Sequence, residues 1–327
     1  MRYRTLGQTG LGVSEVGIGA FPLSGEWTRA DGSVQRWSGV TDAESIALIH
    51  RAEELGVNLI DTAEGYGNGH SEEVVGAALH GARRAKWIVA TKVQPNRGQD
   101  RDTPDPAAAK ERIVSACEES LRRLGMETID LYQLHAIPHA WASGPVMEAL
   151  AELRAAGKVR WYGVSTNNRT AIDALREHGP VHVLQIGYNL LERAADELLH
   201  WSRQEEIGTL IRVPLAKGWL TGKYFDPSVT LPEEDVRYER FTRPEARAEM
   251  RKLPQLAFLG EGRGRTMVQA ALRFVLDHPG VSCVIAGAKT RAQIHENTAA
   301  SGIPPLAADE LRRALAIAET IRTPGWT

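Results

Sequence analysis

The feature that most constrains the fold is a regular alternation of short apolar stretches with helix-forming segments. Eight apolar stretches occur, and a helical pattern follows each one, directly or after a loop. Strict alternation of this kind predicts a parallel sheet, because parallel strands need a crossover between them. Eight such units in one chain favour a (β/α)8 TIM barrel. The predicted strands lie near Val16, Leu59, Val89, Leu131, Trp161, Leu184, Leu210 and Val284.

The 327 residues exceed the roughly 250 that such a barrel commonly uses. Tyr3–Leu6 and Val13–Val16 flank the turn signal Gln8-Thr9-Gly10 and predict an N-terminal β-hairpin. Residues 226–264 are rich in charge and proline, which predicts a long loop with a short helix near 243–253. Residues 307–321 predict an extra C-terminal helix. We therefore interpret residues 1–327 as one barrel domain.

A doubly wound open sheet is the competing fold. That fold requires a glycine-rich phosphate turn between the first strand and a helix. The segment Gly17-Ile18-Gly19-Ala20-Phe21-Pro22 has glycines in the expected place, but it does not lead into a helical pattern. The sequence therefore favours the closed barrel.

The composition excludes several classes of partner. The formal net charge of -2 offers no basic excess for a nucleic acid. No apolar run approaches the roughly 20 residues that a membrane span needs. The two cysteines, Cys117 and Cys283, fit a reducing compartment, and the N-terminus does not resemble a signal peptide. We expect a cytoplasmic protein without a nucleic-acid or membrane partner, and the sequence does not indicate its oligomeric state.

Four ionisable side chains follow the second, third and fourth predicted strands. Asp61, Lys92 and His135 end these strands, and Tyr66 lies in the loop beyond Asp61. Active sites of such barrels lie at the carboxyl ends of the strands, so these groups should share one rim. The Lys92 ammonium, held by Asp61, should lower the pKa of Tyr66 and make it a proton donor. His135 could donate a hydrogen bond to a substrate oxygen.

Other interpretations of these residues remain open at this point. A lysine and an aspartate at strand ends can form a purely structural ion pair. Lys92 could instead form a Schiff base, if it were desolvated and separated from Asp61. A metal-dependent hydrolase is not favoured, because no ligand cluster stands at the strand ends and His135 with His139 is a poor substitute. We expect no metal.

These motifs resemble those of the aldo-keto reductase family, in the same order over nearly the whole chain. Asp61-Thr62-Ala63-Glu64-Gly65-Tyr66-Gly67 is similar to the family signature, and Lys92 and His135 end strands like its third and fourth. Further matching segments are Tyr3-Arg4-Thr5-Leu6-Gly7, Gly163-Val164-Ser165, 185–191, 214–223, 285–289 and Glu296-Asn297.

The resemblance implies a barrel that binds an extended nicotinamide cofactor and reduces aldehydes or ketones, or runs the reverse reaction. Tyr66 would be the general acid, Lys92 and Asp61 would tune it, and His135 would position the carbonyl oxygen. The implied cofactor contacts run from the nicotinamide end, where Tyr188 would stack on the ring, to the adenine end. They are Ser165, Asn167, Gln185, Tyr188, Pro214, Leu215, Gly218, Leu220, Gly287, Lys289, Gln293, Glu296 and Asn297.

Three positions depart from the family pattern. Thr166 stands where asparagine is usual, so either Asn167 supplies the amide contact or that contact is changed. Val213 replaces the usual serine before Pro214. The segment 136–139 replaces the usual Trp-Pro-Asp after the histidine and leaves the substrate open.

Charge decides the expected cofactor, and aromatic residues suggest the pocket. Lys289 and Arg291 could meet a 2′-phosphate, so we expect NADPH in preference to NADH. The predicted substrate pocket for a small carbonyl compound comprises Phe21, Trp27 and Gln94, together with Trp37 and the loop 226–264. A non-catalytic, cofactor-binding regulatory subunit is the alternative function.

Overall fold

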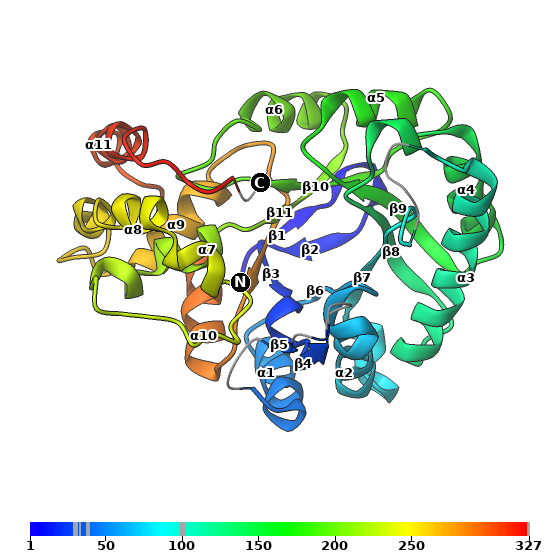
Figure 1. The fold of residues 1–327 in the computed structure, drawn as a ribbon, viewed down its shortest axis with the longest axis horizontal. Helices are drawn as coiled ribbons and strands as arrows, with labels where there is room; N and C mark the ends of the chain where they lie inside the picture. The colour runs from blue at the N-terminus through cyan, green and yellow to red at the C-terminus, as the bar shows by residue number, and fades with distance from the viewer. Residues whose placement is uncertain (29–31, 33, 37–39, 99–102, 326–327) are drawn as a thin grey trace.

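The computed structural model describes residues 1–28, 32, 34–36, 40–98 and 103–325. Its centre is a closed barrel of eight parallel strands, in the order β10-β11-β12-β3-β6-β7-β8-β9 (Figure 1). This confirms the predicted barrel. The strands are β3 (Val16–Gly19), β6 (Leu59–Asp61), β7 (Ile88–Val93), β8 (Ile129–His135), β9 (Val159–Ser165), β10 (Val183–Gly187), β11 (Gly208–Arg212) and β12 (Cys283–Gly287).

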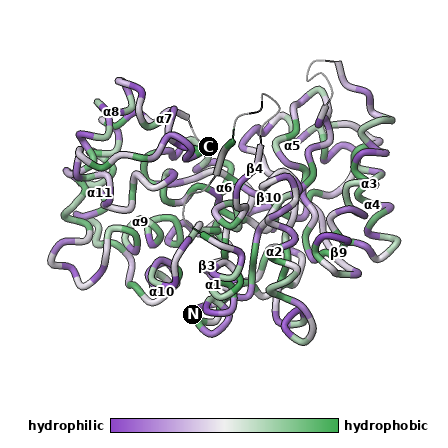
Figure 2. The backbone as a smooth tube through the Cα atoms, turned by 60° about the horizontal axis from the view of Figure 1, so that its bottom comes forward, coloured by the Kyte–Doolittle hydropathy of each residue, from purple (hydrophilic) through white to green (hydrophobic). Residues whose placement is uncertain are grey.

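Helices surround the barrel, and local sequence signals set their ends. Thr41 and Glu44 form a capping box at the start of α1, and Gly125 ends α3 with left-handed backbone. Hydrophobic and hydrophilic stretches alternate along the outer helices (Figure 2), and α1, α3 and α9 bury apolar residues such as Leu48, Ile113 and Leu272. These helices are α1 (Asp42–Glu54), α2 (His70–Ala78), α3 (Pro106–Leu124), α4 (Gly144–Ala155), α5 (Arg169–Arg176), α6 (Asp196–Gln204), α9 (Met267–Leu276) and α10 (Arg291–Ala299).

The predicted N-terminal hairpin closes the end of the barrel where the strands begin. Strands β1 (Tyr3–Thr5) and β2 (Gly12–Ser14) pair antiparallel, as expected. Leu6, Leu11 and Val13 pack with side chains from the barrel interior in one buried cluster. Gly7, at a φ of 50°, lies so close to the main chain of Gly208 that a Cβ would not fit.

A second hairpin follows the first barrel strand, where the sequence indicated only a loop. It consists of β4 (Glu26–Thr28) and β5 (Val34–Arg36), with Trp27 opposite Gln35 in the register. Trp27 is half-buried. Trp37, which we expected in the same pocket wall, lies outside the described residues.

Residues 226–264 form helical turns with a hydrophobic core, which corrects the prediction of a long loop. The expected helix near 243–253 is α8 (Pro244–Met250), preceded by α7 (Tyr238–Thr242) and followed by the 3₁₀ segment Leu253–Leu259. Phe241 and Leu256 are buried against Trp219 in one cluster, which also includes residues of α11 (Ala308–Ala318). Figure 1 shows α7, α8 and α11 together on one side of the barrel. The helices of this segment have only five to seven residues each, so their apolar residues do not repeat often enough to show a helical period.

Within the part of the chain that the structure describes, none of the helices combines the length and the hydropathy that a membrane crossing requires.

Candidate active site

The structure brings the four predicted ionisable residues together at the carboxyl ends of neighbouring strands. Asp61 ends β6, Lys92 lies near the end of β7, and His135 ends β8. Tyr66 begins the short turn Tyr66–Gly69 that follows β6. The Lys92 Nζ is 3.3 Å from the Tyr66 hydroxyl oxygen, and the rings of Tyr66 and His135 lie edge to face at 5.9 Å.

Lys92 and Asp61 form a fully desolvated ion pair. Lys92 is 0% exposed and Asp61 2%, and the Lys92 Nζ donates to Asp61 Oδ2 at 2.7 Å and to the Thr62 carbonyl at 2.7 Å. Burial opposes the charge on Lys92, but Asp61 and Tyr66 raise the pKa of Lys92 above its ordinary value. The amine therefore stays protonated. The separation of Lys92 from Asp61 that a Schiff-base role would need is not found.

Two glutamine side chains complete the surroundings of Asp61. The Gln185 Nε2 donates to Asp61 Oδ1 at 2.7 Å, and the Gln133 Nε2 donates to the same oxygen at 3.3 Å. Gln133 was not among the predicted site residues. Its position two residues before His135, on the same face of β8, was the available signal. These donors fix the carboxylate that holds Lys92.

Tyr66 is a protonated phenol in this site. Burial raises the pKa of Tyr66 above its ordinary value, although the charge of Lys92 lowers it. Asp61 contributes to the increase and Arg212 opposes it. The expected lowering of the Tyr66 pKa is therefore wrong for the protein without ligands, because desolvation of the phenolate outweighs the nearby ammonium.

His135 is a neutral imidazole. Burial, together with the positive charges of Lys92 and Arg212, lowers the pKa of His135 to about 3. A neutral ring carries one N–H, so His135 can donate one hydrogen bond without adding a charge. Arg212, which ends β11, was not among the predicted site residues.

Aromatic side chains extend from Tyr66 toward the second hairpin. The Phe21 ring lies 4.7 Å from the Tyr66 ring and 6.1 Å from the Trp27 ring. The predicted pocket residues Phe21 and Trp27 therefore form one apolar wall that reaches the phenol. Gln94 is exposed just beyond β7, and its backbone N–H donates to Glu64 Oε1.

The predicted contacts at the ends of β9 and β10 are bonded to each other. Ser165 Oγ donates to Gln185 Oε1 at 3.3 Å, beside the Asp61 network. The Asn167 side chain donates to the Gly187 carbonyl at 2.9 Å and accepts from the Gly187 N–H at 2.8 Å. Thr166 Oγ1 accepts from the Asn168 N–H. Because its amide already joins the two strand ends, Asn167 functions as a structural link in this structure.

The segment after β11 adopts an unusual backbone. Val213, Ala216, Lys217 and Gly218 all have positive φ values, which is rare for non-glycine residues and most unusual for a β-branched valine. The N–H groups of Ala216 and Gly218 donate to the carbonyls of Val213 and Leu215, and these bonds hold the segment in a compact turn. Predicted Pro214, Leu215, Gly218 and Leu220 lie in this segment.

Cations cluster beside this segment. Burial and neighbouring Arg240 and Arg212 lower the pKa of Lys217 to about 8. Burial and Arg237 likewise lower the pKa of Lys289 to about 8. Arg237 comes from the segment 226–264 and donates to the Lys217 carbonyl at 3.3 Å. That segment therefore adjoins the residues expected to hold the cofactor.

The residues expected at the adenine end follow β12. Gly287 ends that strand, and its carbonyl accepts from the buried Asn297 side chain at 3.3 Å. The Gln293 Oε1 accepts from the Lys289 N–H at 2.7 Å. Glu296 is half-buried on the same helix, α10. These contacts and α10 place all five residues at one corner of the rim.

Tyr188 does not lie where we expected it. Its ring is 3% exposed, stacks on Phe274 at 5.8 Å, and its hydroxyl donates to Asp196 Oδ1 at 2.9 Å. The side chain therefore occupies the layer between α6 and α9. This placement does not support stacking on a nicotinamide ring, and we remove Tyr188 from the cofactor site.

Among the described residues, one group has ligand atoms close enough for a metal ion. The candidate ligand atoms of Asp196, His200 and His278 lie within 4.8 Å of one another. However, His278 Nδ1 accepts from the Gly280 N–H at 3.0 Å, so the ring proton resides on Nε2, which is 3.4 Å from Asp196 Oδ1. A protonated Nε2 cannot donate a lone pair to a metal, so these residues fit an Asp–His pair better.

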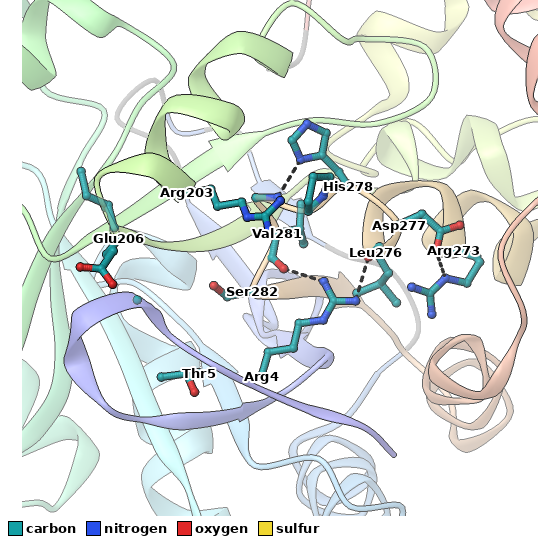
Figure 3. A pocket seen from close by; sticks show the side chains of 14 residues that line it. Arg4, Thr5, Arg203, Glu206, Arg273, Leu276, Asp277, His278, Val281 and Ser282 are labelled. Atoms are coloured by element: carbon teal, nitrogen blue, oxygen red, sulfur yellow. Dashed lines mark hydrogen bonds and ion pairs between the residues drawn. The ribbon is translucent and has the colours of Figure 1, made fainter.

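A pocket of about 700 Å³ lies away from the four ionisable residues (Figure 3). Its lining comes from the N-terminal hairpin and from the segments that precede β11 and β12, at the end where strands begin. The polar groups there are largely bonded to protein: Arg4 donates to the carbonyls of Val281 and Leu276, and Arg273 donates to Asp277. This end of a barrel contributes to stability.

The fold and the site together define a barrel oxidoreductase. The model of the Aldo/keto reductase family matches residues 15–319, and the chain belongs to that family. It is 33% identical over 299 residues to the aldo-keto reductase YhdN of Bacillus subtilis, covering 90% of this chain and 87% of the relative.

Two solved structures show the similarity in three dimensions. The glycerol dehydrogenase AKR11B4 from Gluconobacter oxydans has a TM-score of 0.78 and 30% identity, over 97% of this chain and 96% of that one. An aldo/keto reductase from Klebsiella pneumoniae, in complex with NADP and acetate, has a TM-score of 0.69 and 26% identity, over 99% and 97%.

Proposed function

We propose that this chain reduces a small aldehyde or ketone to an alcohol with NADPH, and that Tyr66 is the general acid. The observation that carries the proposal is the buried pair Lys92–Asp61 with its ammonium 3.3 Å from the Tyr66 hydroxyl. A structural ion pair alone would not require a phenol and a neutral imidazole beside it. All four groups face the same rim, where the apolar wall of Phe21 and Trp27 begins.

The chain's residues fit a nicotinamide dinucleotide. Lys217 and Lys289 place positive charge beside the segment that follows β11, which suits a pyrophosphate, whereas Arg237 is paired with Asp235. Ser165 and Gln185, next to Asp61, would hold the carboxamide of the nicotinamide. Gly287, Gln293, Glu296 and Asn297 would surround the adenosine end. Of the predicted contacts, Tyr188 is left out because its ring is buried against Phe274, and Asn167 because both ends of its amide are bonded to the main chain of Gly187.

Proton transfer follows from the protonation states. When bound, a reduced nicotinamide supplies the hydride that adds to the carbonyl carbon. The neutral His135 donates a hydrogen bond to the carbonyl oxygen and fixes its direction. As negative charge grows on that oxygen, Tyr66 transfers its hydroxyl proton to it, which gives the alcohol and a phenolate. The protonated Lys92 stabilises that phenolate, and Asp61 keeps Lys92 in place.

The cofactor preference rests on charge. Lys289 and Arg291 at the start of α10 could pair with a 2′-phosphate, which favours NADPH. One relative, 30% identical over 324 residues, is named NADH-specific methylglyoxal reductase in Escherichia coli, so the preference varies among relatives of this distance. Equal or better kcat/KM with NADH would contradict this part of the proposal.

The test follows NADPH consumption across a panel of aldehydes, ketones and quinones. We expect turnover by the wild-type chain and a loss of about 10²–10⁴-fold in kcat for Tyr66→Phe, with the affinity for NADPH nearly unchanged. Wild-type turnover in Tyr66→Phe would refute the assignment of the acid. Fluorescence titration with NADPH separates loss of chemistry from loss of binding.

A regulatory, cofactor-binding subunit is the second candidate. A relative from Arabidopsis thaliana, 31% identical over 331 residues, is named probable voltage-gated potassium channel subunit beta. Tight NADPH binding with no turnover across the panel would favour this alternative.

A further inference from the structure

Arg212 reaches the candidate site from the wall that faces Lys92. In the circular strand order, β11 stands four places from β7 in either direction, so the two strands lie on opposite sides of the barrel (Figure 1). Arg212 ends β11, and Lys92 lies near the end of β7. The two cations therefore approach the rim of the barrel from opposite directions.

Asn167 positions the Arg212 side chain. The Arg212 Nη2 donates to Asn167 Oδ1 at 3.4 Å, and the Gly187 N–H donates to that same oxygen at 2.8 Å. The Asn167 Nδ2 donates to the Gly187 carbonyl at 2.9 Å. Gly187 is also the register partner of Arg212 between β10 and β11. The Asn167 amide is therefore held by the main chain of Gly187, and it holds the guanidinium of Arg212.

Desolvation makes the charge of Arg212 effective at the acid. Arg212 is only partly exposed, and its positive charge opposes the rise in the pKa of Tyr66 and helps to lower the pKa of His135. A charge near a low-dielectric rim acts more strongly than one in water. The other ionisable groups that face Tyr66 are Asp61 from β6, Lys92 from β7 and His135 from β8. Glu192 and Lys217 face Arg212 itself.

We propose that Arg212, held by Asn167, is a positioning residue for the acid: a second positive charge, facing Lys92 across the barrel, that stabilises the Tyr66 phenolate. This deepens the proposed function and rests on it. When Tyr66 gives up its proton to the carbonyl oxygen, the negative charge on the phenol is met by Lys92, which donates to it, and by the charge of Arg212 from the opposite wall. Arg212 therefore strengthens Tyr66 as an acid in carbonyl reduction and favours the phenolate that alcohol oxidation needs.

The test measures ionisation of Tyr66 directly, without turnover. Tyrosine labelled with ¹³C at the ring carbon that bears oxygen is titrated by NMR, and Tyr66→Phe identifies the Tyr66 signal. We expect Arg212→Met to raise the pKa of Tyr66 by about 1, while Arg212→Lys stays near the wild type. Asn167→Ala should shift it in the same direction but less. Arg169→Met, on the exposed start of α5, is the matched control and should change nothing.

Kinetics then extend the result to the reaction. In Arg212→Met, the pH at which alcohol oxidation reaches half its plateau should rise, so oxidation below that pH falls about tenfold, and Arg212→Lys should restore it. A Tyr66 titration that is the same in Arg212→Met and wild type would overturn the proposal. An accompanying loss of NADPH affinity would then place Arg212 in the cofactor site. If the wild type reduces no carbonyl compound, the proposed function fails, yet the titration still decides the role of Arg212.

Discussion

The Cα of Gly67 lies against the main chain of Ser24, and a Cβ at this position would collide with the Ser24 carbonyl oxygen. Gly67 also has a φ of 59°, in the left-handed region. The glycine that follows Tyr66 therefore allows the turn to pack against the segment after β3, and this packing places the phenol.

Gly67→Ala should misplace Tyr66 while leaving the barrel folded. We expect kcat to fall about 10²-fold, because a displacement near 1 Å has that order of effect on a positioned catalytic group. The matched control is Gly65→Ala, since Gly65 has open space around it and no positive φ. Steady-state kinetics and thermal unfolding of both variants provide the measurement. Equal kcat values would show that this contact does not position the acid.

Lys92→Met should lower both activity and stability, because it leaves Asp61 buried without its cation. We expect the free energy of unfolding to fall by about 3–5 kcal/mol. In the double variant Asp61→Asn with Lys92→Met, no charge remains unpaired, so stability should recover in large part while activity stays low. Denaturant titrations and kcat measured together separate the two effects. Recovery of activity in the double variant would contradict the assigned role of Lys92.

Affinity for NADPH should decrease as the pH rises through about 8. Lys217 and Lys289 have pKa values of about 8 without ligand, so both lose charge in this range. A bound anion prefers the charged lysines, and the Kd should rise by up to about tenfold per lysine for each further pH unit. Lys289→Met should remove part of the pH dependence of the Kd for NADPH. It should also reduce the ratio of the affinity for NADPH to that for NADH. Lys86→Met, at an exposed position, is the control. A flat pH profile would indicate that neither lysine contacts the cofactor.

Glu15 should stabilise the closed end of the barrel. Its carboxylate is 3% exposed, accepts from Arg4 and Ser301 and lies 3.7 Å from Arg273. Burial opposes ionisation, but Arg4 and Ser301 lower the pKa of Glu15 below its ordinary value. A lowered pKa gives stability that is present above the unfolded value of 4.5 and is lost as the pH falls toward the folded value.

Glu15→Gln should therefore cost about 3 kcal/mol in unfolding free energy at pH 7, and this difference should shrink below about pH 4.5. The exposed Glu54→Gln serves as the control. Urea denaturation at several pH values measures both. A difference that is independent of pH would mean that shape, not charge, is the important property of Glu15.

The barrel was predictable from sequence, because apolar stretches and helical segments alternate eight times along the chain. The hairpin of β4 and β5 was missed, because each of its strands has only one apolar residue, Trp27 or Val34, and so shows no apolar stretch. Residues 226–264 were not predicted as a helical unit, because their helices are short. Their apolar residues also pack against α11, which is distant in the sequence, so no local pattern indicates this contact. That residues 1–327 form a single domain stays a prediction.

The site was predictable where a residue's role depends on its strand end, as for Asp61, Lys92 and His135. The sequence did not predict features that depend on the direction in which a side chain points. Tyr188 follows β10 directly, yet its ring turns outward to Phe274, which no local pattern indicates. The pKa of Tyr66 was predicted in the wrong direction because burial, which sequence does not measure, outweighs the charge of Lys92. The contacts of Arg212 with Asn167 and of Gln133 with Asp61 join residues that are distant in the sequence, so no local pattern indicates them.

The N-terminal hairpin restricts the route by which molecules reach the candidate site. Leu6, Leu11 and Val13 fill that end with side chains, so everything that reaches Tyr66 must enter by the opposite mouth. For the proposed cofactor and substrate, which would share that mouth, whichever binds deeper would bind first and leave last. The closed end of the barrel therefore implies ordered binding at the other end.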